Sequence, residues 1–439
     1  MEDAALLKYT EGVPRYTSYP TALQFAEDVG PEEYRQWLGR LDPAAPLSLY
    51  LHIPFCSSLC WFCGCQTTVV NNYEPIAGYL DLLAQEIEMV ADALGGGHRA
   101  AHVHWGGGTP TLTTGPDFQR VMALLATHFD ISGNTEVAVE IDPRTISEDT
   151  VAAMAKAGVN RVSIGVQDVS DRVQLAINRV QPFEVVENAV ALLRANGISS
   201  ISFDIMYGLP YQTPETMIEG MDRVLRLDPD RVSLFGYGHV PRMRPHQNLM
   251  DVDALPDPSD RLELYRAAAK RLSVRGYVPV GLDHFAKTND PMAAAATTGE
   301  LHRNFQGYTT DTAGALIGFG ASAIGSLPQG YIQNAPTVPA WRKAISAGSF
   351  ATVRGFRLGD DDRLRRAVIE RLMCDLTVNL DQVCAEFGTD ADQFADSLLA
   401  LKPLEADGAA EISGNTVTVP KSARLAVRSA CLAFDAYAT

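Results

Sequence analysis

The stretch Tyr50–Thr67, YLHIPFCSSLCWFCGCQT, decides how this sequence is interpreted, because it places Cys56, Cys60, Cys63 and Cys65 within ten residues. The stretch begins with an apolar segment that is typical of a β-strand. Four thiols that follow a strand so closely need a common chemical explanation.

Three kinds of site could use the spacing C-x3-C-x2-C-x-C. A structural zinc site usually draws its ligands as pairs from separated segments, and the chain shows no second pair at ligand spacing. A thioredoxin-like dithiol needs only two cysteines and leaves Cys56 and Cys65 unexplained. An iron–sulfur cluster held by three thiolates uses the loop best, and its fourth iron stays open to a small molecule. The residues alone favour the cluster over the zinc and dithiol alternatives.

The composition predicts a folded cytoplasmic protein. Of 439 residues, 46% are hydrophobic and 20% charged, and the formal charge of 36 − 53 = −17 opposes binding to nucleic acid or to anionic membranes. No apolar run of about 18 residues is present, so we expect no membrane span. In a reducing compartment the cysteines are not expected to form disulfides. Cys374, Cys384 and Cys431 are expected to be buried small hydrophobes.

Strand-like and helical patterns alternate through the first part of the chain, which predicts βαβ units and a parallel sheet. The expected strands are 47–53, 101–105, 136–142, 161–166, 201–209 and 231–238, and the expected helices are 79–94, 118–129, 145–158, 182–197 and 213–227. Polar residues follow these strands, and in a barrel the carboxyl ends of the strands share one face. We therefore predict an α/β protein with a partial (β/α)6 barrel.

The pattern changes after residue 245 and again after residue 357. We expect 257–276 to be a helix, 277–286 a strand and loop, and 301–310 and 314–326 loops that return to the site. Helices with a short hairpin at 409–420 predict a C-terminal, mostly helical, winged-helix-like domain. The predicted domains are an N-terminal segment near the site (1–45), the barrel with its extensions (46–356) and the helical domain (357–439). The acidic C-terminal region argues against DNA binding.

The cysteine spacing, with Phe62 before the third cysteine, resembles the signature of the radical S-adenosylmethionine superfamily. The likeness extends to one family, the oxygen-independent coproporphyrinogen III oxidases (coproporphyrinogen dehydrogenases). The motifs that carry it are PRYTSYPTA (14–22), SLYLHIPFCSSLCWFCGC (48–65), HWGGGTPT (104–111), EIDPR (140–144), GVQD (165–168), NR (178–179), FDIMYGLPYQTPE (203–215), GLDHFA (281–286) and LHRNFQGYTT (301–310). The C-terminal helices also resemble the second domain of that family.

The resemblance implies one [4Fe–4S] cluster, ligated by Cys56, Cys60 and Cys63, and two molecules of S-adenosylmethionine. The first molecule would contact Tyr50, Gly107, Glu140 and Ile324. The second would contact Phe62, Gly108, Thr109, Gln167, Arg179, Asp204 and the backbone near Gly238. Cys65 is the fourth family cysteine and a candidate catalytic residue near the cluster, and related haem chaperones generally lack it.

The implied reaction is the anaerobic oxidative decarboxylation of two propionates of coproporphyrinogen III to vinyl groups, which gives protoporphyrinogen IX. Arginines suit the four substrate carboxylates, and the candidates lie in loops predicted near the site: Arg15, Arg242, Arg244 and Arg303. The expected partner is a reduced flavodoxin- or ferredoxin-type electron donor, and we expect a monomer. The alternatives are a haem-binding chaperone and another tetrapyrrole-acting radical enzyme on the same fold.

Overall fold

The computed structural model describes residues 3–10 and 12–438, so the predicted domain ends at residues 1 and 439 lie outside it. The described chain divides into two compact units. One comprises residues 26–256 and 313–357 and is called the sheet unit here. The other comprises residues up to 25, 257–312 and 358 onward and is called the helical unit. The division between Arg357 and Leu358 falls one residue after the predicted start of the C-terminal domain, residue 357. The three-domain division of the sequence stays a prediction.

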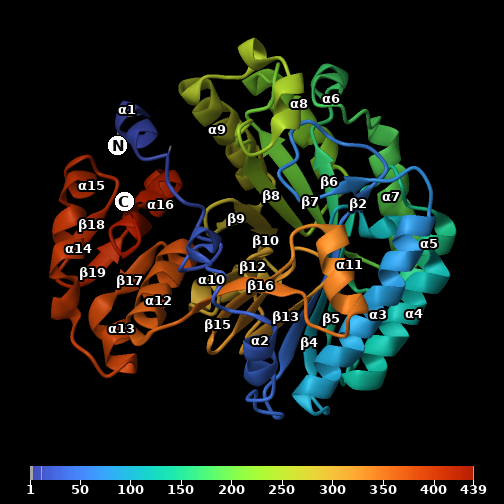
Figure 1. The fold of residues 1–439 in the computed structure, drawn as a ribbon. Helices are drawn as coiled ribbons and strands as arrows, with labels where there is room; N and C mark the ends of the chain where they lie inside the picture. The colour runs from blue at the N-terminus through green and yellow to red at the C-terminus, as the bar shows by residue number, and fades with distance from the viewer. Residues whose placement is uncertain (1–2, 11, 439) are drawn as a thin grey trace. The chain divides into compact units, whose positions relative to one another are not determined.

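The sheet unit contains the predicted alternation of strands and helices. Its parallel strands are β1 (Leu47–Ile53), β4 (Ala100–Gly107), β5 (Glu136–Ile141), β6 (Arg161–Gln167), β7 (Ser200–Tyr207) and β8 (Arg231–Gly236), paired in this order. The helices between them are α3 (Glu74–Leu94), α4 (Gly115–His128), α5 (Glu148–Lys156), α6 (Asp171–Ala176), α7 (Phe183–Ala195) and α8 (Pro214–Leu225). Helices α3, α4, α5 and α7 run along the outside of the strands (Figure 1). The predicted partial barrel is therefore confirmed.

Local sequence explains where several of these helices begin and end. The side chains of Thr114, Ser147 and Thr213 accept hydrogen bonds from backbone N–H groups in the first turns of α4, α5 and α8. Helix α3 ends at Gly95, which has a left-handed conformation. Every residue of β1 is buried, as expected for a central parallel strand. The capping residues set the ends of the helices around the sheet. The cysteine loop follows the buried strand β1.

One part of the sheet unit differs from the sequence prediction. Residues 314–326, expected to be a loop, form β13 (Ala315–Phe319) and β14 (Ile324–Leu327). Strand β13 pairs in parallel with β1. Strands β14, β15 (Gly330–Asn334) and β16 (Thr352–Arg357) then extend the sheet, each antiparallel to the strand before it. The remaining elements are α2 (Pro31–Leu38), β2 (Phe55–Cys56), β3 (Thr68–Val69), α11 (Val338–Ser346) and the short 3-10 turns η2 (Pro110–Leu112), η3 (Pro245–Leu249) and η4 (Val252–Ala254).

The helical unit is built around its own core, in which Leu372, Phe394 and Phe434 are fully buried. Its elements before residue 313 are α1 (Asp3–Lys8), η1 (Ala22–Gln24), α9 (Pro258–Val274), β9 (Tyr277–Val280), β10 (His284–Lys287), α10 (Pro291–Thr298), β11 (His302–Asn304) and β12 (Gly307–Thr309). Those after residue 357 are α12 (Asp360–Asp375), β17 (Thr377–Asn379), α13 (Leu380–Glu386), η5 (Ala391–Phe394), α14 (Ala395–Ala400), α15 (Lys402–Ala406), β18 (Glu411–Ser413), β19 (Thr416–Thr418), η6 (Lys421–Ala426) and α16 (Val427–Leu432).

The predicted C-terminal helices and hairpin are present, and the structure adds strand β17 to the hairpin in the order β17-β19-β18. The predicted strand and loop at 277–286 is an antiparallel hairpin of β9 and β10. Cys374, Cys384 and Cys431 are buried and unpaired by disulfides, as expected. No helix among the described residues has the length and apolarity needed to span a bilayer.

An ion pair in the helical unit gives a testable pH dependence of stability. His302 Nδ1 lies 3.1 Å from Glu370 Oε1, and this hydrogen bond raises the pKa of His302. Burial acts to raise the pKa of Glu370, but the hydrogen bond and charge of His302 outweigh it and lower that pKa. A histidine whose folded-state pKa is raised stabilises the fold below its unfolded-state pKa, and this contribution disappears as the pH rises through the folded-state value.

We therefore expect His302→Gln to reduce the free energy of unfolding more at about pH 6 than at about pH 8.5, on either side of the ordinary histidine range. Denaturant unfolding of the two proteins at both pH values measures this difference. Glu370→Gln removes the same pair and should show the same loss of pH dependence. An equal cost of His302→Gln at both pH values would show that the pair does not titrate with folding.

Candidate active site

The carboxyl ends of neighbouring strands in the sheet unit bring most of the predicted site residues to one edge of the sheet. In the register of β1 and β4, His52 pairs with Gly106 and Ile53 with Gly107. Glu140 stands near the end of β5, Gln167 ends β6, and Asp204 pairs with Gly165 across β6 and β7. Parallel strands end at the same edge, so these side chains are neighbours.

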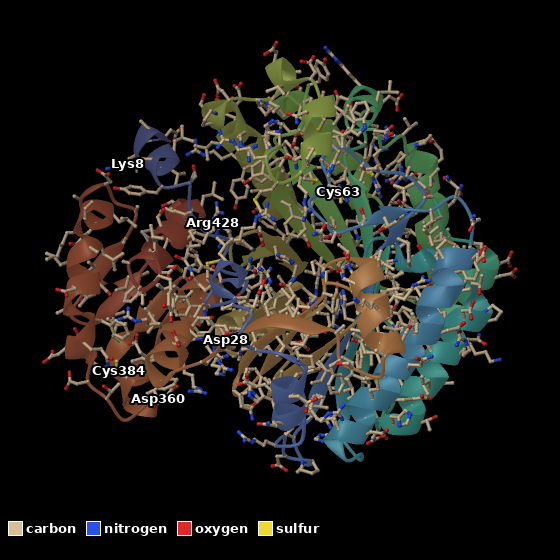
Figure 2. The ribbon with its side chains drawn as sticks, viewed as in Figure 1. Lys8, Asp28, Cys63, Asp360, Cys384 and Arg428 are labelled. Carbon is tan, nitrogen blue, oxygen red and sulfur yellow. The ribbon has the colours of Figure 1, made fainter. Side chains whose placement is uncertain are left out.

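The cysteine loop is fixed to this edge through its backbone. The N–H of Gly108 donates to Ile53 O at 2.8 Å and the N–H of Thr109 donates to Phe55 O at 2.7 Å. On the far side of the loop, Trp61 N donates to Ile177 O at 2.9 Å. The loop is therefore held between the end of β4 and the segment that follows α6. Figure 2 marks Cys63 among the side chains of the sheet unit.

The sulfurs of Cys56, Cys60 and Cys63 all accept hydrogen bonds. Thr109 Oγ1 donates to Cys56 Sγ at 3.5 Å. Cys60 Sγ accepts from two arginines, and Cys63 Sγ accepts from the backbone N–H of Cys65 at 3.4 Å. Sulfurs that accept hydrogen bonds are suited to the thiolate form, which is the form that ligates iron. The donor set around these sulfurs therefore fits an iron–sulfur cluster.

Cys65 differs from the other three cysteines of the loop. The hydrogen bond between their side chains lowers the pKa of Cys63 to about 6 and raises the pKa of Cys65 well above its usual value. Burial raises the pKa of Cys56 to about 11. The thiol of Cys65 thus acts as a donor toward Cys63, in contrast to the acceptor sulfurs.

No group of three or more His, Cys, Asp or Glu side chains in the described chain is arranged to hold a single metal ion. A zinc site would bring its ligands to one ion. A cubane cluster differs, because each thiolate binds a different iron and the sulfurs stay apart. The arrangement of the loop is compatible with the cluster.

Five residues at the ends of β1, β4 and β5 form a connected polar group. Glu140 Oε2 accepts from Gly107 N at 3.1 Å, and Glu140 Oε1 lies 3.1 Å from His104 Nε2. The Tyr50 ring stacks on His104 at 5.7 Å, and its hydroxyl lies 3.0 Å from His52 Nδ1. Burial acts to raise the pKa of Glu140, but the hydrogen bond and charge of His104 lower it. An ionised carboxylate is therefore available here.

Ile324 belongs beside this group because of the register of the sheet. Tyr50 pairs with Gly318 of β13, and β14, which begins at Ile324, pairs with β13. The structure thus places the predicted residues Tyr50, Glu140 and Ile324 in one sheet, on β1, β5 and β14, with one strand between β1 and each of the other two. His52 and His104 were not among the predicted site residues. Their signal was positional: His52 is two residues after Tyr50 on β1, and His104 pairs with Tyr50 across β1 and β4.

Gln167 ends β6, Asp204 lies in the second half of β7, and Arg179 belongs to the segment between α6 and α7. Gln167 has a φ of 65°, a left-handed conformation that is uncommon outside glycine. Arg179 Nη2 donates to Gly165 O at 2.8 Å, and Ser163 Oγ donates to Asp204 Oδ2 at 3.1 Å. Arg179 and Asp204 are thus bonded to β6, and Arg179 also reaches the cysteine loop at Cys60 Sγ.

The segment after β8 also contacts the cysteine loop. Gln247 Nε2 donates to the carbonyls of both Phe62 and Gly238, each at 3.2 Å. Arg244 Nη1 donates to Gln66 Oε1 at 3.0 Å. Arg242, two residues before Arg244 in the same segment, is exposed. Arg244 therefore lies at the loop, as predicted, and Gln247 is a tether that the sequence did not reveal.

Arg15 and Arg303 belong to the helical unit, so their predicted role at the site stays a prediction. Arg15 is exposed. The Arg303 guanidinium lies 4.4 Å from the centre of the Tyr308 ring, and its Nε donates to Tyr16 O at 3.2 Å.

The chain matches two family models. Residues 50–224 match the radical SAM superfamily, and residues 358–426 match the HemN C-terminal domain. Together with the partial barrel and the three-cysteine loop, the first match defines the class: this is a radical S-adenosylmethionine enzyme.

Comparison with whole proteins then identifies the family. The chain is 46% identical to the oxygen-independent coproporphyrinogen III oxidase of Bradyrhizobium diazoefficiens over 99% of its own length and 97% of the relative. It is 39% identical to that of Escherichia coli K12, over 99% and 95%. A solved structure of coproporphyrinogen III oxidase (HemN) from Escherichia coli, a radical SAM enzyme, matches with a TM-score of 0.94, 38% identity and coverage of 100% and 99%. The chain belongs to the oxygen-independent coproporphyrinogen III oxidases, and the predicted cofactor types, a [4Fe–4S] cluster and S-adenosylmethionine, agree with this.

Proposed function

We propose that this protein converts two propionate side chains of coproporphyrinogen III into vinyl groups without oxygen, giving protoporphyrinogen IX in porphyrin and haem biosynthesis. The observation that carries the proposal is the cysteine loop, whose three sulfurs accept from Thr109, from Cys65 and from Arg179. The relatives that match almost the whole chain are named coproporphyrinogen III oxidases.

In this proposal Cys56, Cys60 and Cys63 hold the cluster and leave one iron for S-adenosylmethionine. When bound, the cluster and S-adenosylmethionine supply a 5′-deoxyadenosyl radical, which can take hydrogen from an unactivated carbon. Two S-adenosylmethionine molecules are proposed. The residues assigned to the first are Tyr50, Gly107, Glu140 and Ile324, and those assigned to the second are Phe62, Gly108, Thr109, Gln167, Arg179, Asp204 and Gly238.

Glu140 and Asp204 offer carboxylate oxygens that can accept hydrogen bonds from S-adenosylmethionine. The carboxylate of Glu140, ionised because its pKa is lowered, can accept from an amine or a ribose hydroxyl. Asp204 can accept in the same way at the end of β7. The backbone carbonyls of Phe62 and Gly238 both accept from Gln247, which ties the cysteine loop to the segment that follows β8.

Each propionate must lose one hydrogen atom, one electron and carbon dioxide to become a vinyl group. A side-chain acid or base cannot remove hydrogen from an unactivated carbon at neutral pH, so the chain's own residues bind, orient and exclude water. We assign the binding of substrate carboxylates to Arg15, Arg242, Arg244 and Arg303, because a guanidinium can bind a carboxylate through two parallel hydrogen bonds. Arg244, already beside the cysteine loop, is the best placed of those in the sheet unit.

The proposal includes a reduced flavodoxin- or ferredoxin-type electron donor, a monomeric state and a cytoplasmic location. The location is supported by the chemistry of the loop, since all seven cysteines are free thiols and a reducing compartment keeps thiols available for iron.

The test is an anaerobic assay of the reconstituted protein with reductant, S-adenosylmethionine and coproporphyrinogen III. We expect tripropionate and then dipropionate products on chromatography. Cleavage of S-adenosylmethionine by an intact cluster without either product would refute the substrate assignment. Stoichiometric haem binding without vinyl formation would instead indicate a haem-delivery protein on the same fold.

A further inference from the structure

Cys60 has a different environment from the other two proposed ligands. Its sulfur accepts hydrogen bonds from two guanidinium groups, Arg144 Nη2 at 3.7 Å and Arg179 Nη1 at 3.5 Å. Cys56 accepts from a neutral hydroxyl, and Cys63 accepts from the backbone N–H and the neutral thiol of Cys65. Cys60 thus accepts directly from two guanidinium groups, whereas the positive charge of Arg244 acts on Cys63 from a greater distance.

Asp142 holds both guanidinium groups in place. Arg144 Nε donates to Asp142 Oδ1 at 2.9 Å and Arg144 Nη2 donates to Oδ2 at 2.6 Å, so the pair is bidentate. Arg179 Nη1 donates to the same Oδ2 at 3.2 Å. Asp142 directly follows β5, and Arg179 is also bonded to Gly165 of β6. The triad is thus attached to two strands of the sheet and cannot move freely away from Cys60.

The triad stays charged and carries a net charge of one positive unit, because two guanidinium groups face one carboxylate. Burial acts to raise the pKa of Asp142, but the hydrogen bond from Arg144 and the charges of both arginines lower it. A guanidinium stays protonated throughout the pH range of proteins, so Arg144 and Arg179 both carry a positive charge. The side chains of Asp142 and Arg179 are 9% and 8% exposed, so water screens the charges only weakly.

We propose that Arg144, positioned by Asp142, raises the reduction potential of the [4Fe–4S] cluster by donating to the sulfur of Cys60. The inference rests on the proposed function, because it requires Cys60 to be a ligand. Hydrogen bonds to cluster sulfurs and nearby positive charge stabilise the extra negative charge of the reduced cluster. The step is the uptake of one electron from an external one-electron donor, and no bond in Arg144 forms or breaks.

Arg144 is thus a positioning residue for electron transfer, while Arg179 is also assigned to S-adenosylmethionine. Substitutions of Arg144 and of Asp142 should shift the reduction potential of the cluster in opposite directions. Arg144→Met removes the positive charge and the donor at similar size, and it should lower the potential. Asp142→Asn removes the negative charge while its amide oxygen can still accept from Arg144 Nε, so Arg144 stays at Cys60 and the potential should rise. A purely structural ion pair would change stability in both variants without this opposition of sign.

The experiment is an anaerobic redox titration of the reconstituted protein, with the reduced cluster followed by electron paramagnetic resonance. We expect Arg144→Met to lower the ratio of reduced to oxidised cluster about tenfold at a fixed potential, which is about 59 mV for a one-electron couple. Asp142→Asn should raise the ratio by a similar factor. Arg144→Lys keeps the charge and should stay closer to wild type. The matched control is Arg120→Gln, which removes an arginine that pairs with Asp117 on the surface of α4, and it should leave the ratio unchanged.

Iron content separates the possible failures. A wild-type protein that assembles no [4Fe–4S] cluster would refute the proposed function. Full iron content with ratios within about twofold of wild type in both Arg144→Met and Asp142→Asn would refute only the role of Arg144, since a twofold change is a small fraction of the tenfold unit. Shifts of the same sign would refute it as well. If Arg144→Met retains too little iron to titrate, Asp142→Asn decides alone: a ratio within about twofold of wild type, or a lower ratio, would refute the role of Arg144.

Discussion

Replacing Cys60 with serine is expected to abolish the visible absorption of the iron–sulfur cluster and, with it, all vinyl product. Cys60 is buried, and its sulfur accepts from Arg144 and Arg179. A serine hydroxyl stays protonated at neutral pH, so it is a much poorer iron ligand than a thiolate. With two thiolates left, the loop cannot satisfy three irons. Cys56→Ser and Cys63→Ser should give the same result.

Two cysteines of the same chain provide controls for this prediction. Cys384 lies on α13 in the helical unit (Figure 2), and Cys384→Ser should leave iron content and activity unchanged. Cys65→Ser should keep the cluster, because Cys65 is a donor to Cys63 and not an acceptor. Iron and sulfide analysis of the purified proteins measures the outcome. Full cluster content in Cys60→Ser would mean that the ligand assignment is wrong.

The parallel sheet and most of the site were predictable because their signals are local. The alternation of strand and helix patterns defined β1 and β4 to β8, and strand ends in such a fold share an edge. Residues Glu140, Gln167 and Asp204 could be selected because each is a polar residue at the end of an apolar strand. The spacing of the cysteines likewise requires no knowledge of the rest of the fold.

The strands β13 and β14 were missed because their sequence, GALIGFGASAIGS, is rich in glycine and reads as a loop. The structure shows why glycine is needed at one of these positions. A Cβ on Gly320 would lie 2.2 Å from the hydroxyl of Tyr79 and 2.7 Å from His52 O, and the φ of Gly320 is 96°. The turn between the two strands packs closely against α3 and β1, a contact between distant residues that no local pattern records.

The triad at Cys60 was missed for a related reason. Asp142 and Arg144 are two residues apart in the motif EIDPR, and from sequence alone such a pair is indistinguishable from a surface ion pair. Their meeting with Cys60 and Arg179 depends on how the loop after β1 crosses the ends of β5 and β6. Substrate arginines are harder still, since the four candidates are divided between the two units.

Replacing Gly108 with alanine is expected to destabilise the protein and remove most of its activity. A Cβ at Gly108 would lie 2.5 Å from Phe55 O, 2.9 Å from Phe55 N and 3.0 Å from Ile53 O, which are all backbone atoms. The N–H of Gly108 also donates to Ile53 O, at 2.8 Å. The alanine must push apart the two segments that hold Cys56, because no flexible side chain can give way.

We expect a loss of about 3 kcal/mol in the free energy of unfolding, the upper end of the cost of overpacking. Displacement of the cysteine loop should lower activity about a hundredfold. Denaturant unfolding and the anaerobic assay measure the two effects. The matched control is Gly64→Ala in the same loop, where a Cβ would meet nothing within 4 Å. It should change stability little.

The same variant separates two roles of Gly108. If Gly108 mattered only as a contact of S-adenosylmethionine, Gly108→Ala would keep the stability of wild type and weaken only the binding of that cofactor. The structure instead predicts that stability and iron content fall together, because the added methyl group presses on the backbone of Phe55, directly before Cys56. Wild-type stability in Gly108→Ala would contradict this packing role and leave the cofactor contact as the reason for glycine at this position.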